Sequence, residues 1–527
     1  MKNYYICLVA IVLMGFSLTA CGRNADETDS NYETVVYEED LPPNGSTGDG
    51  LISDEVDSYE LLTVREFGTV PVSELTTEHF LCDLDYMLYV LENNFALFDV
   101  AYWASGANIH TIIENARSAV LDITDMDILY FLMILEQHFL PLSRSTGHFS
   151  FISPGLHRQI RRMPRSAWQY TLHSHGARTR LLLPHVVQFY ETLDNIVEQD
   201  TGERFSQFFL QYSEHDLYLL YRRFLYELRF HGYYDLADEI WQAVLSFDDS
   251  KISELTAYAS EILSAIPNVQ TRVIEEDRIA YISVDSFMTY PPGLDQQIIF
   301  NFYAQIRDFD HLIIDLRNNG GGAPAWFYDV FVSPNIDREF IVEGFSFIAY
   351  GNYSSFYANF ENNRSSFPVS GVPVVIDEKI WPIEEVLELY YLPQLNIADM
   401  ERLNYAFRTA VTISPNLLRR FDYEPAFQGK IWLLTGPLMQ SAAQISAWVT
   451  QDIGFATLVG EVTGGYYGGA RTHIALPYSG LIFTMDLFYV TDRHGRPLEA
   501  GTIPDFFNRE GMNALETVLA MIAEGEY

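Results

Sequence analysis

The chain has 527 residues, of which 48% are hydrophobic and 15% aromatic, and its formal net charge is −39. This composition excludes a wholly disordered chain, because it supplies enough apolar surface for a large core and two or three domains. The excess of 71 Asp and Glu over 32 Lys and Arg argues against a nucleic-acid partner, which needs a basic surface to neutralise its phosphates.

The first residues have the pattern of a bacterial secretory signal. Lys2 is followed by an apolar run from Tyr4 to Ala20, which ends in small residues before Cys21. The Leu-Thr-Ala-Cys ending resembles a lipobox, whose cysteine is lipidated, and an uncleaved anchor helix is the alternative. Both predict a body that lies outside the cytoplasm and is anchored to the cell membrane by its N-terminus.

An acidic segment follows the signal. Residues 26–60 contain 12 Asp or Glu and no Lys or Arg, which predicts a flexible spacer because such a segment repels itself and cannot bury a core. The cysteines Cys7, Cys21 and Cys82 permit neither a disulfide nor a cysteine-based metal site. Cys82 lies in an apolar helical pattern and is predicted to be a small buried residue.

The folded part begins with helical patterns and continues as α/β. One helix is predicted to begin at Thr76-Thr77-Glu78 and a second to span about 125–139. Buried strands are predicted at 278–284, 311–317 and 430–435, with helical stretches between them. Residues 473–492 alternate in strand fashion around Pro477-Tyr-Ser-Gly480, which predicts a hairpin.

These patterns predict six successive segments. They are a signal peptide (1–21), an acidic tether (22–70), a helical N-terminal domain (71–150), a mainly helical region without an evident PDZ module (151–275), an α/β core (276–510) with an insertion at about 340–425, and a C-terminal helix (511–527).

Two segments of the α/β core contain groups that could take part in catalysis. Asp315-Leu-Arg-Asn-Asn-Gly-Gly-Gly322 ends a strand in three glycines, which bring bare backbone N–H groups close to a ligand. In Thr435-Gly-Pro-Leu-Met-Gln-Ser-Ala-Ala-Gln444, a helix begins near Ser441, so its hydroxyl lies at the positive end of that helix. Taken singly, the glycines predict only a turn and Ser441 only a helix cap.

The order of four motifs favours catalysis. After the two segments above come Ala456-Thr-Leu-Val-Gly-Glu-Val-Thr-Gly-Gly465 and Pro497-Leu-Glu-Ala-Gly-Thr-Ile-Pro-Asp505. This series resembles the C-terminal-processing (tail-specific) serine peptidases, a family that includes the tricorn protease core. The resemblance covers about residues 278–508 and implies a crotonase-like α/β core, a protein or peptide substrate, and no metal or organic cofactor.

The base differs from the one that many members of this family use. Their lysine follows the Val-Gly-Glu segment, but Tyr466 stands at that place, and the four lysines of the chain (Lys2, Lys251, Lys379 and Lys430) lie elsewhere. The resemblance to the tricorn-like branch implies instead a triad of Ser441, His148 in Ser-Thr-Gly-His, and Glu499 in Pro-Leu-Glu-Ala-Gly. His473 is the alternative base.

The implied mechanism is peptide hydrolysis through an acyl-enzyme. A serine hydroxyl needs a base to become a nucleophile, and a carboxylate can orient the imidazole that provides it. The N–H groups of Ala442 and of Gly321 or Gly322 would form the oxyanion hole. An inactive peptidase-like protein that binds an apolar or peptide ligand remains the alternative, since the retinoid-binding protein of the photoreceptor matrix resembles the same family.

Overall fold

A computed structural model describes residues 70–143, 145–153, 156–158, 183–199, 221, 224–246, 248–288, 292–349, 351, 374–375, 380–415, 425–465 and 469–526. The chain divides into two compact units, residues 1–265 with 470–486 and residues 266–469 with 487–527. The predicted signal peptide and tether, with Cys21, lie outside the described residues. None of the described helices is long and apolar enough to cross a membrane.

The first unit is mainly helical. Its helices are α2 (Thr77–Asn94), α3 (Phe98–Ser105), α4 (Ile109–Asp122), α5 (Ile128–Ser143), α9 (Pro184–Gln199), α12 (Tyr234–Leu245) and α13 (Asp249–Ala265). The predicted start of the first helix is confirmed, because Thr76 is its N-cap and shares a capping box with His79. The prediction that Cys82 is buried is wrong, since Cys82 is exposed on α2. Residue 82 lies on the side of the helix away from the buried Phe80, Leu84 and Met87.

A β-hairpin completes the first unit. Strands β11 (Gly469–Ala475) and β12 (Ile482–Asp492) confirm the hairpin predicted around Pro477–Gly480. Strand β1 (Ser150–Phe151) pairs antiparallel with the beginning of β12, with Ser150 opposite Thr484. Strand β12 passes from the first unit into the second between Asp486 and Leu487.

The second unit contains a six-stranded sheet in the order β13-β10-β9-β4-β3-β2. The three predicted strands are confirmed as β3 (Ile279–Val284), β4 (His311–Asp315) and β9 (Lys430–Thr435), which are adjacent and parallel. They read as unbroken apolar runs because both faces of parallel strands are covered. The other strands of this sheet are β2 (Val269–Glu275), β10 (Thr457–Gly460) and β13 (Phe506–Phe507).

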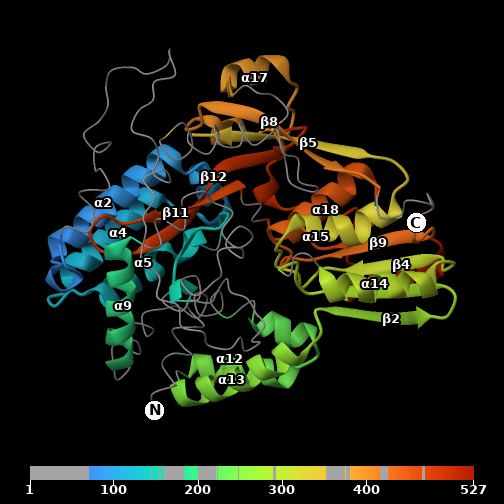
Figure 1. Cartoon of the computed structure of the whole chain (residues 1–527), viewed down its shortest axis with the longest axis horizontal. Coiled ribbons are helices and arrows are strands. Elements are labelled where there is room, and N and C mark those ends of the chain that lie inside the picture. Colours follow the sequence, from blue (N-terminus) through green and yellow to red (C-terminus); the bar gives the residue numbers. More distant parts are fainter. Residues whose placement is uncertain are drawn as a thin grey trace, which may run out of the picture. The chain divides into compact units, whose positions relative to one another are not determined.

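Helices cover the sheet. Helix α19 (Ala514–Glu524) packs its Val518 and Met521 against Trp432 and Val459 of the strands, in one core. Figure 1 shows α14 (Gly293–Ile306) beside β4 and β2, and α18 (Ala442–Ile453) with α15 (Pro324–Phe327) near β9. The fold class is therefore α/β, as predicted.

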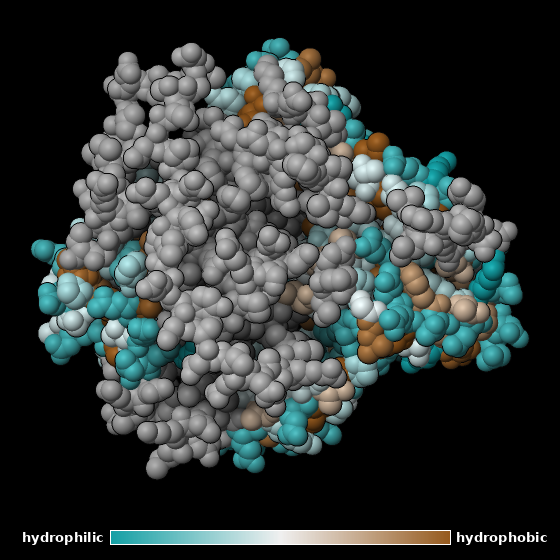
Figure 2. Space-filling view, in the orientation of Figure 1, coloured by the Kyte–Doolittle hydropathy of each residue, from teal (hydrophilic) through white to brown (hydrophobic). Residues whose placement is uncertain are grey.

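The predicted insertion contains ordered strands among its described residues. Strand β5 (Phe340–Ile348) pairs antiparallel with β8 (Tyr405–Ile413) along its full length and with the end of β12. Shorter elements are β6 (Val374–Val375), β7 (Trp381–Pro382) and α17 (Ile383–Leu389). On the face shown in Figure 2, the coloured surface is mostly hydrophilic, with hydrophobic residues only in small groups.

Candidate active site

Ser441 lies on a tight turn between strand β9 and helix α18 of the second unit. It is the N-cap residue of α18, but its side chain makes no capping hydrogen bond. Its backbone has φ 52° and ψ −124°, and it is one of two described non-glycine residues with a positive φ. Such a conformation costs on the order of 1–3 kcal/mol and is concentrated at functional sites. The geometry therefore disfavours the cap interpretation and leaves the half-buried hydroxyl available for chemistry.

The glycine motif packs directly against this turn. A Cβ added to Gly321, whose φ is +104°, would lie 2.9 Å from Ser441 Cβ and 2.9 Å from the Ala442 nitrogen. Only glycine permits this approach, so Gly321 and Ser441 are neighbours although 120 residues separate them (441 − 321). The Asp315 carboxylate, at the end of β4, accepts hydrogen bonds from the Arg317 side chain and from Tyr281. These bonds hold the beginning of the glycine motif.

The predicted oxyanion donors differ in their hydrogen bonds. The Gly321 N–H group donates to the side-chain oxygen of Asn319, 2.8 Å away. Within the described part of the chain, the structure shows no hydrogen bond donated by the N–H group of Gly322 or of Ala442. Ala442 is the first residue of α18, where the helix itself offers no acceptor. Ala442 and Gly322 are therefore better placed than Gly321 to receive an oxyanion.

Glu499 belongs to the same unit and lies close to the serine turn. It is half-buried in the 3₁₀ helix η7 (Leu498–Ala500). The Ser441 N–H group donates to the Gly465 carbonyl at 3.2 Å. A Cβ on Gly465 would collide with the Glu499 carbonyl oxygen. The Thr-Gly-Gly motif thus lies between Ser441 and Glu499.

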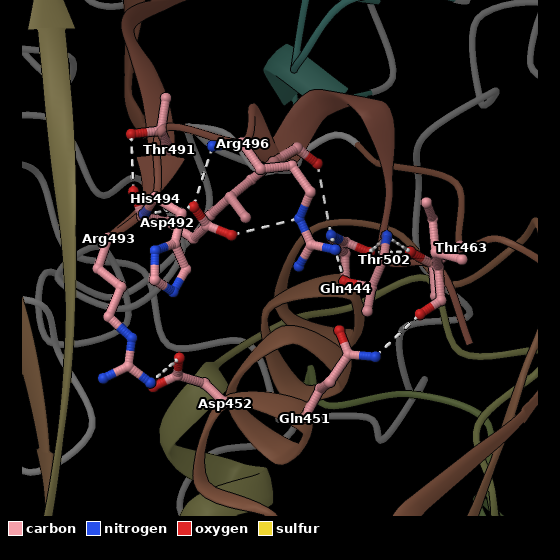
Figure 3. Close-up of polar contacts among 12 residues, drawn as sticks. Gln444, Gln451, Asp452, Thr463, Thr491, Asp492, Arg493, His494, Arg496 and Thr502 are labelled. Carbon is pink, nitrogen blue, oxygen red and sulfur yellow. Dashed lines mark hydrogen bonds and ion pairs between the residues drawn. The ribbon is translucent and has the colours of Figure 1, made fainter. Parts of the chain in front are cut away.

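A buried polar network fastens these segments to helix α18. The Gln444 side chain donates to Thr502 Oγ1 at 3.0 Å and accepts hydrogen bonds from Thr502 N–H at 3.2 Å and from Thr463 Oγ1. Figure 3 shows Gln444, Thr463 and Thr502 meeting in this way. Gln444 follows Ser441 by three residues, so the network ties the helix that begins after Ser441 to the segment that contains Glu499.

His148 lies in the first unit, just before strand β1, and its ring faces Asp486 of β12. The ring nitrogen Nδ1 is 3.2 Å from both carboxylate oxygens of Asp486. The His148 side chain is 18% exposed, whereas Asp486 is fully buried. The carboxylate at this nitrogen is therefore Asp486, which the sequence analysis did not single out, while Glu499 belongs to the second unit.

The alternative base His473 is buried, and the lysine of strand β9 lies at the other end of that strand from Ser441. His473 lies in strand β11 and is 1% exposed, so it is almost inaccessible to a substrate. Lys430 begins strand β9, whereas Ser441 follows its other end, ~16 Å further along at the usual strand rise. Its ammonium group lies 4.7 Å from the Trp432 ring. Tyr466 lies outside the described residues.

Comparison with known proteins places the α/β part of the chain in a family. Residues 278–507 match the model of peptidase family S41. Solved structures that are similar to this chain include mature CPAF complexed with lactacystin. That structure has 12% sequence identity and a TM-score of 0.42, over 85% of this chain and 97% of that one. The photosystem II D1 C-terminal processing protease has 15% identity and a TM-score of 0.28, over 50% of this chain and 54% of that one.

The tricorn protease has 16% identity and a TM-score of 0.24, over 47% of this chain and 18% of that one. The assignment depends on the sequence match rather than on these distant structures. Together with the ordered motifs, this match makes the chain a serine-type peptidase whose residues 278–507 form a peptidase family S41 domain.

Proposed function

We propose that this protein is an endopeptidase that cleaves extracytoplasmic proteins or peptides through an acyl-enzyme on Ser441. The observation that carries the proposal is the backbone of Ser441, whose positive φ presents an uncapped hydroxyl at the beginning of α18. A serine on such a strained strand-to-helix turn is typical of hydrolase nucleophiles. Two observations support an oxyanion site at the same place. Gly321 lies in tight contact with Ser441, and the structure shows no hydrogen bond donated by the Ala442 N–H group within the described residues.

His148 is the proposed general base of the reaction. It takes the proton of Ser441 as the hydroxyl attacks the substrate carbonyl, and it later gives that proton to the leaving amine. Its partial exposure and its carboxylate neighbour support this role, whereas the burial of His473 disfavours the alternative. The chain has Tyr466 where many members of the family have their lysine, so Ser441 needs a different base.

Glu499 is the proposed third member of the triad. Its segment packs against Gly465, which accepts the hydrogen bond of the Ser441 N–H group. A carboxylate there would stabilise the imidazolium that forms when the serine loses its proton. The same proposal includes a crotonase-like core and a lipid anchor on Cys21. The anchor would hold the site outside the cytoplasm.

The nucleophile and the base are tested with an unfolded protein substrate. Fluorescent casein hydrolysis is measured for the wild type and for Ser441→Ala, His148→Ala, His473→Ala and Glu499→Gln. We expect the Ser441 and His148 variants to lose about a thousandfold or more in rate and the His473 variant to keep most activity. The base assignment is wrong if His473→Ala alone matches Ser441→Ala.

A fluorophosphonate probe separates an enzyme from a binding protein on the same scaffold. Such a probe phosphonylates an activated serine, so an enzyme should be labelled stoichiometrically at Ser441 and the Ser441→Ala variant should not. Failure to label the folded wild type at high probe concentration would favour the binding protein.

A further inference from the structure

Asp486 contacts both the backbone and the ring of His148. The His148 N–H group donates to Asp486 Oδ2 at 2.7 Å, and the ring nitrogen Nδ1 lies 3.2 Å from both carboxylate oxygens. One side chain therefore restrains the position of the residue and the rotation of its ring.

The strand pairing explains why these two residues meet. Strand β1 pairs antiparallel with β12, with Ser150 opposite Thr484 and Phe151 opposite Phe483. Continuing this register by two residues places His148 opposite Asp486 (150 + 484 = 148 + 486). The Thr484 hydroxyl also donates to the His148 carbonyl at 2.5 Å, so strand β12 holds the His148 backbone from both sides.

Gly147 makes the close approach of the carboxylate possible. Its φ is +43°, and a Cβ at this position would collide with Asp486 Oδ2. The glycine of the Ser-Thr-Gly-His motif is thus required by Asp486, in addition to the turn that it forms. The motif and the buried carboxylate act as one local unit.

A cationic side chain accompanies the buried Asp486 carboxylate. Arg471 of the adjacent strand β11 interacts electrostatically with Asp486. Burial lowers the pKa of the Arg471 guanidinium, and the Asp486 charge opposes that shift. A buried carboxylate needs such partners, because an uncompensated buried charge costs several kcal/mol.

We infer that Asp486 is the positioning residue of His148 and sets the tautomer in which Nδ1 carries the proton. A carboxylate only accepts hydrogen bonds, so the Nδ1 position that faces it must be the donor. The neutral ring then has its lone pair on Nε2, which is the nitrogen that takes the serine proton. This inference rests on the proposed role of His148 as base, and it separates the task of Asp486 from the charge that Glu499 supplies.

The test compares Asp486→Asn with His148→Ala in the purified full-length protein. The readout is the second-order rate constant for fluorophosphonate labelling of Ser441, which needs no knowledge of the natural substrate. The introduced amide keeps the shape of the side chain but can present an N–H group to Nδ1, which favours the wrong tautomer. We expect Asp486→Asn to lower the rate at least a hundredfold, with His148→Ala at least as slow.

Asp492→Asn is the matched control. Asp492 is a buried carboxylate on the same strand, but it accepts hydrogen bonds from the backbone of His494 and Arg496 in a turn (Figure 3). We expect this variant to label within about threefold of the wild type once corrected for the folded fraction. If the folded Asp486→Asn variant labels at the wild-type rate while His148→Ala does not, the inference is overturned and the proposed function stands. If His148→Ala labels normally, the proposed base itself is wrong.

A measurement on the wild type keeps the inference testable even if Asp486→Asn does not fold. In protein labelled with ¹⁵N-histidine, the His148 signals are identified by their loss in His148→Ala. We expect the neutral ring to be protonated at Nδ1, and an Nε2-protonated ring would overturn the inference.

Discussion

Gly321 lies so close to Ser441 that a side chain at position 321 would meet the Ser441 Cβ at 2.9 Å. The same side chain would meet the Gln440 carbonyl oxygen at 2.8 Å, so backbone would have to move. We expect Gly321→Ala to lower fluorophosphonate labelling of Ser441 by about a hundredfold or more, because the nucleophile turn and its oxyanion donors are displaced together.

The control for this variant is Gly454→Ala at the end of α18. Gly454 also has a positive φ, +65°, but no atom lies within 4 Å of the added Cβ. This substitution should cost about 1 kcal/mol in backbone strain without affecting the labelling rate. Equal labelling rates for folded Gly321→Ala and Gly454→Ala would contradict the role given to the Gly321 contact.

The strain at Ser441 predicts a gain in stability when this serine is replaced by glycine. We expect Ser441→Gly to unfold in urea with about 1 kcal/mol more free energy than Ser441→Ala, because glycine adopts a positive φ without the Cβ penalty. Both variants should be inactive. Ser446, inside the same helix, gives the opposite control: Ser446→Gly should be about 1 kcal/mol less stable than Ser446→Ala.

The Gln444 network predicts a strong dependence of stability on one buried amide. Gln444→Leu should lower the free energy of unfolding by roughly 2–4 kcal/mol, because it leaves the buried Thr463 hydroxyl and Thr502 N–H group with fewer partners. Gln451, two turns along α18, donates to the Ile503 carbonyl and to Asp505 at a more exposed place. Gln451→Leu should cost less than about 1 kcal/mol, and equal costs would rule out a special role for the network.

Asp83 predicts a pH dependence of stability in the first unit. Its carboxylate accepts hydrogen bonds from the Tyr478 and Ser479 N–H groups of the β11–β12 turn, each at 2.8 Å. Burial nevertheless raises the pKa of Asp83 from 3.8 to about 7, against the effect of these hydrogen bonds. A group whose pKa is raised on folding stabilises the fold fully below its unfolded pKa, and that contribution is lost as the pH rises through the folded pKa.

The measurement compares the wild type with Asp83→Asn, which cannot ionise. The stability of the wild type relative to this variant should fall as the pH rises from about 4 to about 7, by at most roughly 4 kcal/mol, since each pKa unit corresponds to about 1.4 kcal/mol. Asp122→Asn, at an exposed position on α4, should show no such trend. A flat difference between the wild type and Asp83→Asn over this range would show that the carboxylate stays ionised.

Local patterns were sufficient to predict much of the fold. Strands β3, β4 and β9 are unbroken apolar runs, and the turn at Pro477–Gly480 marks its hairpin. The same patterns misplaced Cys82, because an apolar stretch does not show which side of a helix faces the core. They also missed β5 and β8, whose pairing connects residues from 57 (405 − 348) to 73 (413 − 340) positions apart and leaves no short-range periodic signal.

By itself, the sequence was enough to predict the α/β class, the order of the four motifs and the choice of Ser441. Each strand and motif is a short local pattern, and the linear order of the motifs can be read without knowing how the chain folds. Tertiary structure alone decided that Ser441 is strained rather than capping, that Gly321 touches it, and that Asp486 faces His148. His148 and Asp486 are 338 residues apart and meet only because β1 pairs with β12 in one register. A shift of one residue in that register would turn the carboxylate to the other face of the strand.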